Sequence, residues 1–235
     1  MAKTFTYTDV LNVVGKAVPK TIEDQFSSLA CNVGTNLAWY GYDWRESLKT
    51  LPPFYLIANE QDHKLPPAIV PSDFHGLRKC QLSQIQNTSI HKRPLDPTKD
   101  LQLTHIKDIP KSIAYEPSIS GFRLFPRVPE NMGAPEWFVE GTYKCRPTKI
   151  TNVTLSTTLP FDDMYFNVLV ECVRWGFQML SGSPVAAQQL PLALVAIEQM
   201  ASQEGLNDGD PRISPSEALI GGNISGDIIG FNLYG

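Results

Sequence analysis

The sequence predicts an α+β fold, with helices near both ends of the chain and an antiparallel β region between them. Apolar residues recur at helical spacing toward both ends of the 235-residue chain. The middle instead holds short runs that alternate in side-chain character and are separated by prolines. With 42% hydrophobic and 19% charged residues, the composition is that of a globular protein. The length predicts one large domain, or a core domain with an insertion. The terminal helices are expected to form a bundle.

Residues 1–51 are predicted to hold two helices. Thr8 caps the first, which runs to Val18 before Pro19, and Thr21 caps the second. One apolar stripe marks the second helix: Ile22, Phe26, Leu29, Ala30, Val33 and Leu37. The aromatic run that follows, residues 39–44, suggests either a binding shelf or the closure of a small core. We favour the core because no catalytic partner lies nearby in the sequence.

Residues 52–160 are predicted to form the β region. Four short runs favour strands: 54–58, 78–82, 121–125 and 141–146. Residues 71–77 indicate one helical turn before the second of these strands. Residues 86–118 have weak periodicity and several prolines, which predicts a long projecting loop. A loop of that length in a compact domain is usually functional.

Residues 161–204 are predicted to be helical again and to pack on the N-terminal helices. Asp162 and Asp163 supply a carboxylate cap for the first helix. Pro184 stands in the first turn of the next helix, and Pro191 must kink or split it.

Residues 205–235 are predicted to form an extended C-terminal arm, because Gly, Pro, Asn and Asp dominate their composition. Near its end, large residues alternate along the chain, as in a strand that adds to an exposed sheet edge of a neighbouring protein. The residues expected to make this contact are Ile228, Ile229, Phe231, Leu233 and Tyr234.

The net charge of −4 is unevenly distributed. Residues 78–149 contain 12 basic and 7 acidic residues, a balance of +5, and the remainder has a balance of −9. Such a basic segment is typical of a nucleic-acid surface or of a surface that faces another protein. Its positive charges are scattered, with adjacent pairs only at 78–79 and 92–93, so we favour a solvated or protein-facing surface.

Several classes of protein are not expected. No apolar run approaches the ~18 residues of a membrane span, and the N-terminus lacks the apolar core of a secretory signal. The four cysteines, at positions 31, 80, 145 and 172, form no close pair, which indicates reduced and mostly buried thiols. The sequence therefore predicts a soluble protein made inside a cell.

No constellation of residues indicates catalysis, a metal or a cofactor. The four histidines are more than ten residues apart, and no nucleotide-binding or GxSxG motif is present. Asp162 and Asp163 could serve acid–base chemistry, but helix capping explains them better. Cys80 and Cys145 lie in strand patterns where burial is expected. We therefore expect no catalytic residues, no metal ligands and no cofactor.

The order of these parts resembles the head-to-tail adaptor, or connector, proteins of tailed bacteriophages, particularly the tail-tubular type of short-tailed phages. Together the similar stretches span most of residues 5–204, and each is short. They are the helices at 7–18 and 22–37 ending at Trp39, the turn at 70–77, the strand at 139–147, and the helix starts at 159–165 and 182–184. The 86–118 segment and Pro191 depart from the family pattern.

This resemblance implies a structural protein of the virion neck. Twelve copies would form a ring that docks on the portal, links it to the tail nozzle and lets genome DNA pass through its bore during ejection, without a membrane contact. The basic residues expected at the interface are Lys92, Arg93, Lys107 and Lys111. The alternative is a β-rich virion protein that binds a receptor or carbohydrate through its aromatic residues. A hydrolase using Asp162, Asp163 and a histidine ranks third.

Overall fold

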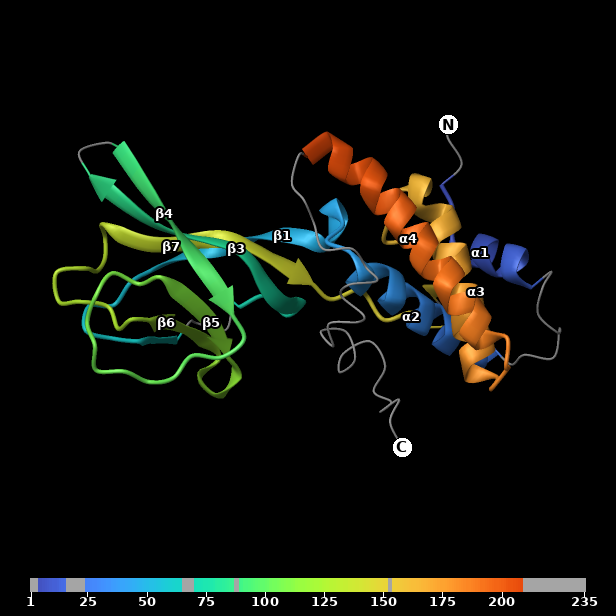
Figure 1. The fold of residues 1–235 in the computed structure, drawn as a ribbon, viewed down its shortest axis with the longest axis horizontal. Helices are drawn as coiled ribbons and strands as arrows, with labels where there is room; N and C mark the ends of the chain where they lie inside the picture. Colours follow the sequence, from blue (N-terminus) through green and yellow to red (C-terminus); the bar gives the residue numbers. More distant parts are fainter. Residues whose placement is uncertain (1–3, 16–23, 65–69, 87–88, 152–153, 209–235) are drawn as a thin grey trace. The chain divides into compact units, whose positions relative to one another are not determined.

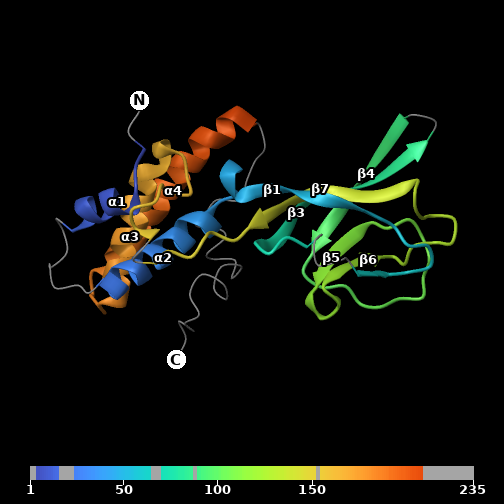
Figure 2. The same cartoon turned by 180° about the vertical axis from the view of Figure 1, so that it is seen from behind.

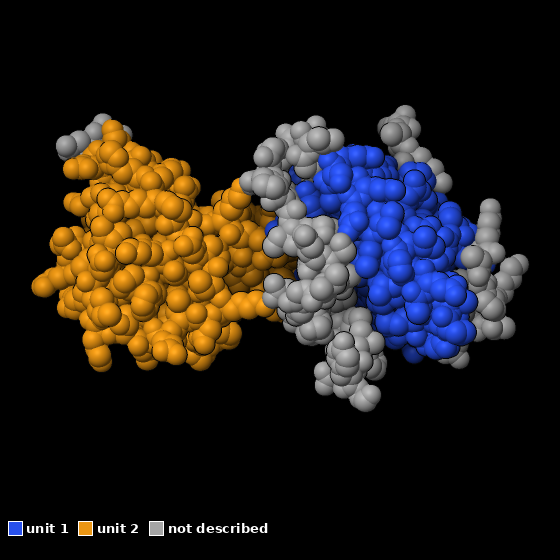
Figure 3. All heavy atoms as spheres, in the orientation of Figure 1, with its two compact units in different colours: residues 1–46, 147–235 blue, residues 47–146 orange. Residues whose placement is uncertain are grey.

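A computed structural model of the protein describes residues 4–15, 24–64, 70–86, 89–151 and 154–208. These residues form four helices and a seven-stranded sheet (Figure 1), so the predicted α+β class is confirmed. The chain divides into two compact units (Figure 3). We call residues 1–46 with 147–235 the helical unit, and residues 47–146 the β unit.

The helical unit is organised around its third helix. Its helices are α1 (Tyr7–Val14), α2 (Asp24–Gly41), α3 (Phe166–Leu180) and α4 (Ala186–Asp208). The helix α3 packs against each of the other three. It therefore buries residues around most of its circumference, including Val168, Leu169, Cys172, Val173, Trp175 and Phe177. None of the helices in the described part of the chain has both the length and the hydropathy that a membrane crossing requires.

Two glycines allow α2 and α3 to approach closely. A Cβ atom on Gly34 would lie 2.5 Å from the Cα atom of Val173, and one on Gly176 would lie 2.6 Å from the carbonyl oxygen of Ala30. Both distances are too short for real atoms, so any larger residue would push the helices apart. Glycine is required at these two positions by packing.

The aromatic run at 39–44 belongs to the core of the helical unit, as predicted. Trp44 is 1% exposed, and its Nε1–H donates a hydrogen bond of 2.6 Å to the carbonyl oxygen of Ala38. Its ring lies edge-on to Tyr42 and to Tyr165. Because these rings pack against one another, the run stabilises the fold and offers no exposed shelf.

The predicted helix boundaries need correction at both ends of the chain. Thr6, not Thr8, caps α1, through a capping box in which the Thr6 N–H donates to the Asp9 carboxylate. The predicted N-terminal boundary signals at 16–22 lie outside the described residues. The Asp162 side chain makes no capping bond, and the Asp163 carboxylate accepts the Phe5 N–H at 3.0 Å instead. The cap prediction was therefore wrong, because a distant backbone donor competes for this carboxylate.

Helix α4 is continuous from Ala186 to Asp208, with Pro191 inside it. The helix is therefore not split at Pro191. It also includes residues 205–208, which were assigned to the extended arm. The rest of that predicted arm, including Ile228, Ile229, Phe231, Leu233 and Tyr234, lies outside the described residues.

The β unit is one seven-stranded sheet in the order β1-β7-β3-β4-β5-β6-β2. Its strands are β1 (Leu48–Tyr55), β2 (Asp62–Lys64), β3 (Phe74–Gln86), β4 (Ser89–Thr98), β5 (Ser112–Glu116), β6 (Gly121–Phe125) and β7 (Trp137–Cys145). All neighbours pair antiparallel except β4 and β5, which are parallel. The sheet is therefore mixed, not purely antiparallel as predicted, and β1 begins inside the segment assigned to helices.

The sheet curls around its own core, as Figures 1 and 2 show. The ring of Phe54 on β1 stacks on that of Phe122 on β6, with centroids 5.3 Å apart, although four strands separate them in the sheet order. The apolar side chains that fill the interior are Leu51, Leu56, Leu82, Leu95, Ile113, Leu124 and Val139. The interior of the β unit is thus filled by side chains from its own strands and from the segments that join them.

The long loop predicted at 86–118 was wrong for most of its length, since β4 and β5 lie within it. Of the ten residues of β4, only Leu95 is buried, so the strand shows no alternation of apolar and polar residues. Among the described residues of this segment, 99–111 is the long irregular stretch, and we call it the 99–111 loop. The helical turn predicted at 71–77 was also wrong, because β3 starts at Phe74.

Candidate protein-binding surface

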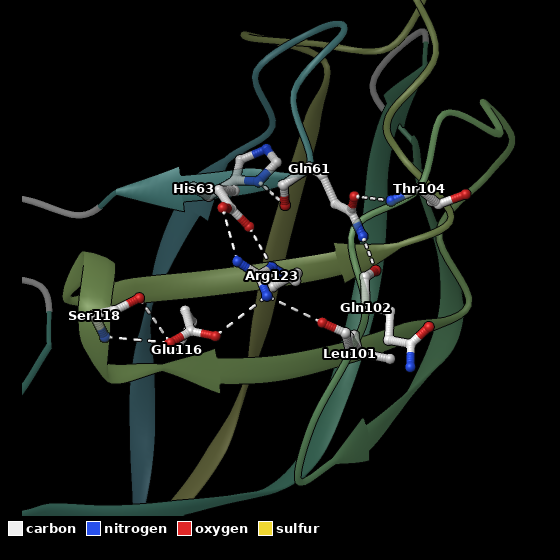
Figure 4. A network of polar contacts seen from close by, with 9 residues as sticks. Gln61, His63, Leu101, Gln102, Thr104, Glu116, Ser118 and Arg123 are labelled. Carbon is white, nitrogen blue, oxygen red and sulfur yellow. Dashed lines mark hydrogen bonds and ion pairs between the residues drawn. The ribbon is translucent and has the colours of Figure 1, made fainter.

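A partly buried arginine holds the start of the 99–111 loop. Arg123, on β6, is 14% exposed and binds both carboxylate oxygens of Asp62, at 2.6 and 3.0 Å (Figure 4). Its Nη1 lies 3.2 Å from the Glu116 carboxylate and donates to the carbonyl oxygen of Leu101 at 3.0 Å. A bidentate pair fixes the guanidinium plane, and we call this group the Arg123 clamp.

A buried glutamine holds the next part of the loop. Gln61 is 5% exposed, and its Nε2 donates to the carbonyl oxygen of Gln102 at 2.8 Å. Its Oε1 accepts the N–H of Thr104, also at 2.8 Å (Figure 4). The amide side chain therefore takes the place of a strand partner on both sides of Leu103.

The far end of the loop is bound as well. The backbone of Arg127 exchanges two hydrogen bonds with the loop, through the Ile106 carbonyl oxygen and the Asp108 N–H. The Lys107 ammonium donates to the side-chain oxygen of Asn59 at 2.6 Å. Between these anchors, Leu103 is 70% exposed and Ile106 is 64% exposed. An irregular loop with defined backbone contacts thus presents two large apolar side chains to solvent.

His63 lies beneath this network in its neutral form. Its Nε2 accepts the N–H of Ile57 at 3.0 Å, so the ring proton must be on Nδ1, which faces the carbonyl oxygen of Gln61 at 3.2 Å. Burial lowers the pKa of His63, and this effect outweighs the opposite influence of the Gln61 carbonyl and the nearby carboxylates of Glu60 and Asp62.

A second feature of the β unit is an open hollow of about 660 Å³ on strands β3, β4 and β7. Its polar centre is Glu140, which accepts from Lys92 at 2.7 Å, Ser83 at 2.9 Å and Gln81 at 3.0 Å. The hydrogen bond from Lys92 lowers the pKa of Glu140. With Lys79 and Arg93 also in its lining, the hollow has an excess of positive charge.

The structure separates the predicted basic interface residues into two places. Lys92 and Arg93 line the hollow on β4. Lys107 belongs to the 99–111 loop, and Lys111 stands at its end, where its N–H donates to the carbonyl oxygen of Phe125 at 2.8 Å. All four belong to the β unit.

The groups considered for chemistry are unsuited to it or occupied. All four cysteines are free and buried, as predicted. Burial raises the pKa of both Cys31 and Cys80 to about 12, and it also raises the pKa of Cys145 and Cys172. Such thiols stay protonated near neutral pH and are poor nucleophiles. Across the described ranges, no three His, Cys, Asp or Glu side chains gather as a metal ion would require.

Sequence reasoning missed the residues that shape the 99–111 loop. Arg123 and Gln61 gave no signal, because their partners Asp62, Leu101 and Gln102 lie 22 to 61 residues away in the sequence. Leu103 and Ile106 did offer one, since they are large apolar residues three apart in a segment with five charged residues. The sequence matches no protein-family model, and no curated protein is significantly similar to it.

Proposed function

We propose that the protein is a structural subunit of the bacteriophage neck that acts through contacts with other proteins and not as an enzyme. Copies of the chain, twelve in number, form the head-to-tail adaptor ring, dock on the portal and join it to the tail nozzle, and genome DNA passes through the bore without sequence-specific binding. In this proposal the four helices act as a bundle, and residues 209–235 form an arm that reaches a neighbouring protein.

The observation that carries the proposal is the division of charge between the two units. The β unit contains 13 Lys and Arg against 10 Asp and Glu, a balance of +3, whereas the helical unit contains 7 against 14, a balance of −7. A closed ring needs a heterologous interface, in which one patch of each subunit meets a different patch of the next. Two units of opposite charge on one chain supply such complementary patches.

Two further features support a role in assembly. Twelve large apolar side chains in the described residues are at least 40% exposed, six in each unit. Among them Leu103 and Ile106 lie three residues apart, as do Leu192 and Val195, and exposed apolar groups that lie together mark interaction sites. The buried thiols and the neutral His63 leave these groups poorly placed for chemistry. The resemblance in the order of parts supplies the identity of the assembly.

The test is the mass of the purified protein, measured by mass photometry over a range of concentrations and salt, followed by imaging with the portal. We expect rings of about twelve copies that bind the portal at one end. Because charge complementarity contributes, assembly should weaken as salt rises from 0.05 to about 0.5 M. A monomer or trimer that binds glycans would contradict the proposal and favour the receptor-binding alternative.

A further inference from the structure

The 99–111 loop has the properties of a pre-organised binding element. The Arg123 clamp and Gln61 fix its backbone on both sides of Leu103, through bonds of 2.8 to 3.0 Å. Leu103 and Ile106 are the two most exposed large apolar residues in the described part of the chain. A loop that is already ordered loses little conformational entropy on binding, so its apolar side chains contribute more fully to affinity.

The helical unit also exposes a surface with large apolar side chains, and this surface lies on α4. One side of α4 is buried in the unit through Ala193, Ile197 and Ala201. The opposite side is exposed and uncharged, and we call it the α4 outer face. It is a stripe at spacings of three and four residues: Val185, Gln188, Leu192, Val195 and Gln199.

A helix that is apolar on both sides is usually covered on both sides. Between Ala186 and Gln203, the only charged residue of α4 is Glu198. Leu192 is 57% exposed and Val195 47% exposed, although an ordinary surface helix would carry charged residues at these positions. The α4 outer face therefore has the composition of an interface.

The charges beside the two surfaces are complementary. The one charged residue of α4 between Ala186 and Gln203, Glu198, is acidic. The 99–111 loop has a basic excess, with three lysines against two aspartates, and the bond of Lys107 to the neutral Asn59 amide does not cancel its charge. Opposite charges around an apolar centre guide two surfaces into register, so the partner that fits the loop best is a second copy of this chain.

We propose that the 99–111 loop of one subunit docks on the α4 outer face of the next, with Leu103 and Ile106 against Leu192 and Val195. This inference rests on the proposed ring, for which it names one subunit contact. Each chain has one loop and one α4 outer face, so the contact is heterologous and can propagate around a closed ring.

The contact is tested by placing a charge on each side separately, as Leu103→Asp and Leu192→Asp. Both side chains are exposed, so both variants should fold, which circular dichroism checks. Each variant alone should assemble roughly tenfold more weakly or worse, as expected when a central interface residue is lost. Ile90→Asp, at an exposed β4 position outside the loop, is the matched control and should assemble like the unmodified protein.

Mixing the two variants gives the decisive result. Leu103→Asp keeps an intact α4 outer face and Leu192→Asp keeps an intact loop, so an equimolar mixture should form dimers that cannot extend. The same pairing can be trapped by oxidation of a Leu103→Cys variant with a Leu192→Cys variant, because the native cysteines are buried. A disulfide that links the two variants is expected.

The outcomes separate the contact from the ring. If both Asp variants form rings as well as the unmodified protein, the contact is wrong while the ring remains. Oxidation of a variant that carries both Leu103→Cys and Leu192→Cys in one chain is a further test. A disulfide that forms only within such a chain, and never between chains, would also overturn the contact. If the unmodified protein stays monomeric at every concentration, the ring itself fails, and the contact with it.

Discussion

The helical unit and the β unit are each stabilised by different interactions. In the helical unit, two glycines bring α2 and α3 into close contact, and aromatic rings fill the space at the end of α2. In the β unit, the 99–111 loop depends on hydrogen bonds from Arg123 and Gln61, with no apolar core of its own. Changes in volume should therefore damage the helical unit, and changes in charge or protonation should damage the loop.

The largest effect is expected for Trp175→Ala on α3. Trp175 is 4% exposed, and removing a buried indole costs about 3–5 kcal/mol through lost burial and the cavity left behind. The free energy of unfolding, from urea titration, should fall by that amount. Met164→Ala, at a 53% exposed position, is the control and should change stability by less than about 0.5 kcal/mol.

Hydrogen exchange measured by peptide shows where the damage lies. In Trp175→Ala, peptides of α2 and α3 should lose protection while the 99–111 loop keeps its own. An equal loss of protection in the loop would break the distinction between the two units.

A smaller effect, located in the β unit, is expected for Arg123→Met. This change leaves Asp62 and Glu116 without their cation and frees the carbonyl oxygen of Leu101, and hydrogen bonds to charged groups contribute about 1.5–3 kcal/mol. Exchange should accelerate at residues 101–106 and stay unchanged in α2 and α3. Ring assembly should weaken too, if the loop makes the proposed contact.

The matched control is Lys92→Met, which removes a half-exposed ion pair with Glu140. Such surface pairs contribute about 0.2–1 kcal/mol. If Lys92→Met loosens the loop as much as Arg123→Met does, the clamp has no special role.

The same difference between the two units explains which elements could be predicted from the sequence. The apolar periodicity of α2 and α3 is local, and Gly121–Phe125 was predicted residue for residue as a strand. The strand β4 was missed because solvent lies on both of its faces and its register depends on β3. The Arg123 clamp joins Arg123 to Leu101 and Asp62, which are 22 and 61 positions away, so no local pattern could reveal it.

The predicted interface residues show the same limit, because folding decides which of them lie together. Sequence charge located Lys92, Arg93, Lys107 and Lys111 in one segment, but folding divides them between the hollow and the loop. The α4 outer face was visible in the sequence as a helix almost without charge. It was not recognised because its two apolar sides cannot be told apart until one of them is seen to be buried.

The smallest effect concerns pH, and it should be confined to the β unit. Because burial lowers the pKa of His63, the unfolded chain takes up a proton at higher pH than the folded one. Stability should therefore be complete above about pH 6.5, the ordinary histidine value, and should fall as the pH drops from there through the folded pKa. Protonation would also place a proton on Nε2, where Ile57 already donates its N–H, so exchange should accelerate at residues 57–63 first.

The variant His63→Gln isolates this contribution, since carboxylates also titrate in the same range. The melting temperature of the unmodified protein should fall more between pH 7 and pH 5 than that of His63→Gln, and the difference between the two slopes reports His63. Parallel slopes for the unmodified protein and His63→Gln would show that the buried histidine is not what makes the loop region sensitive to acid.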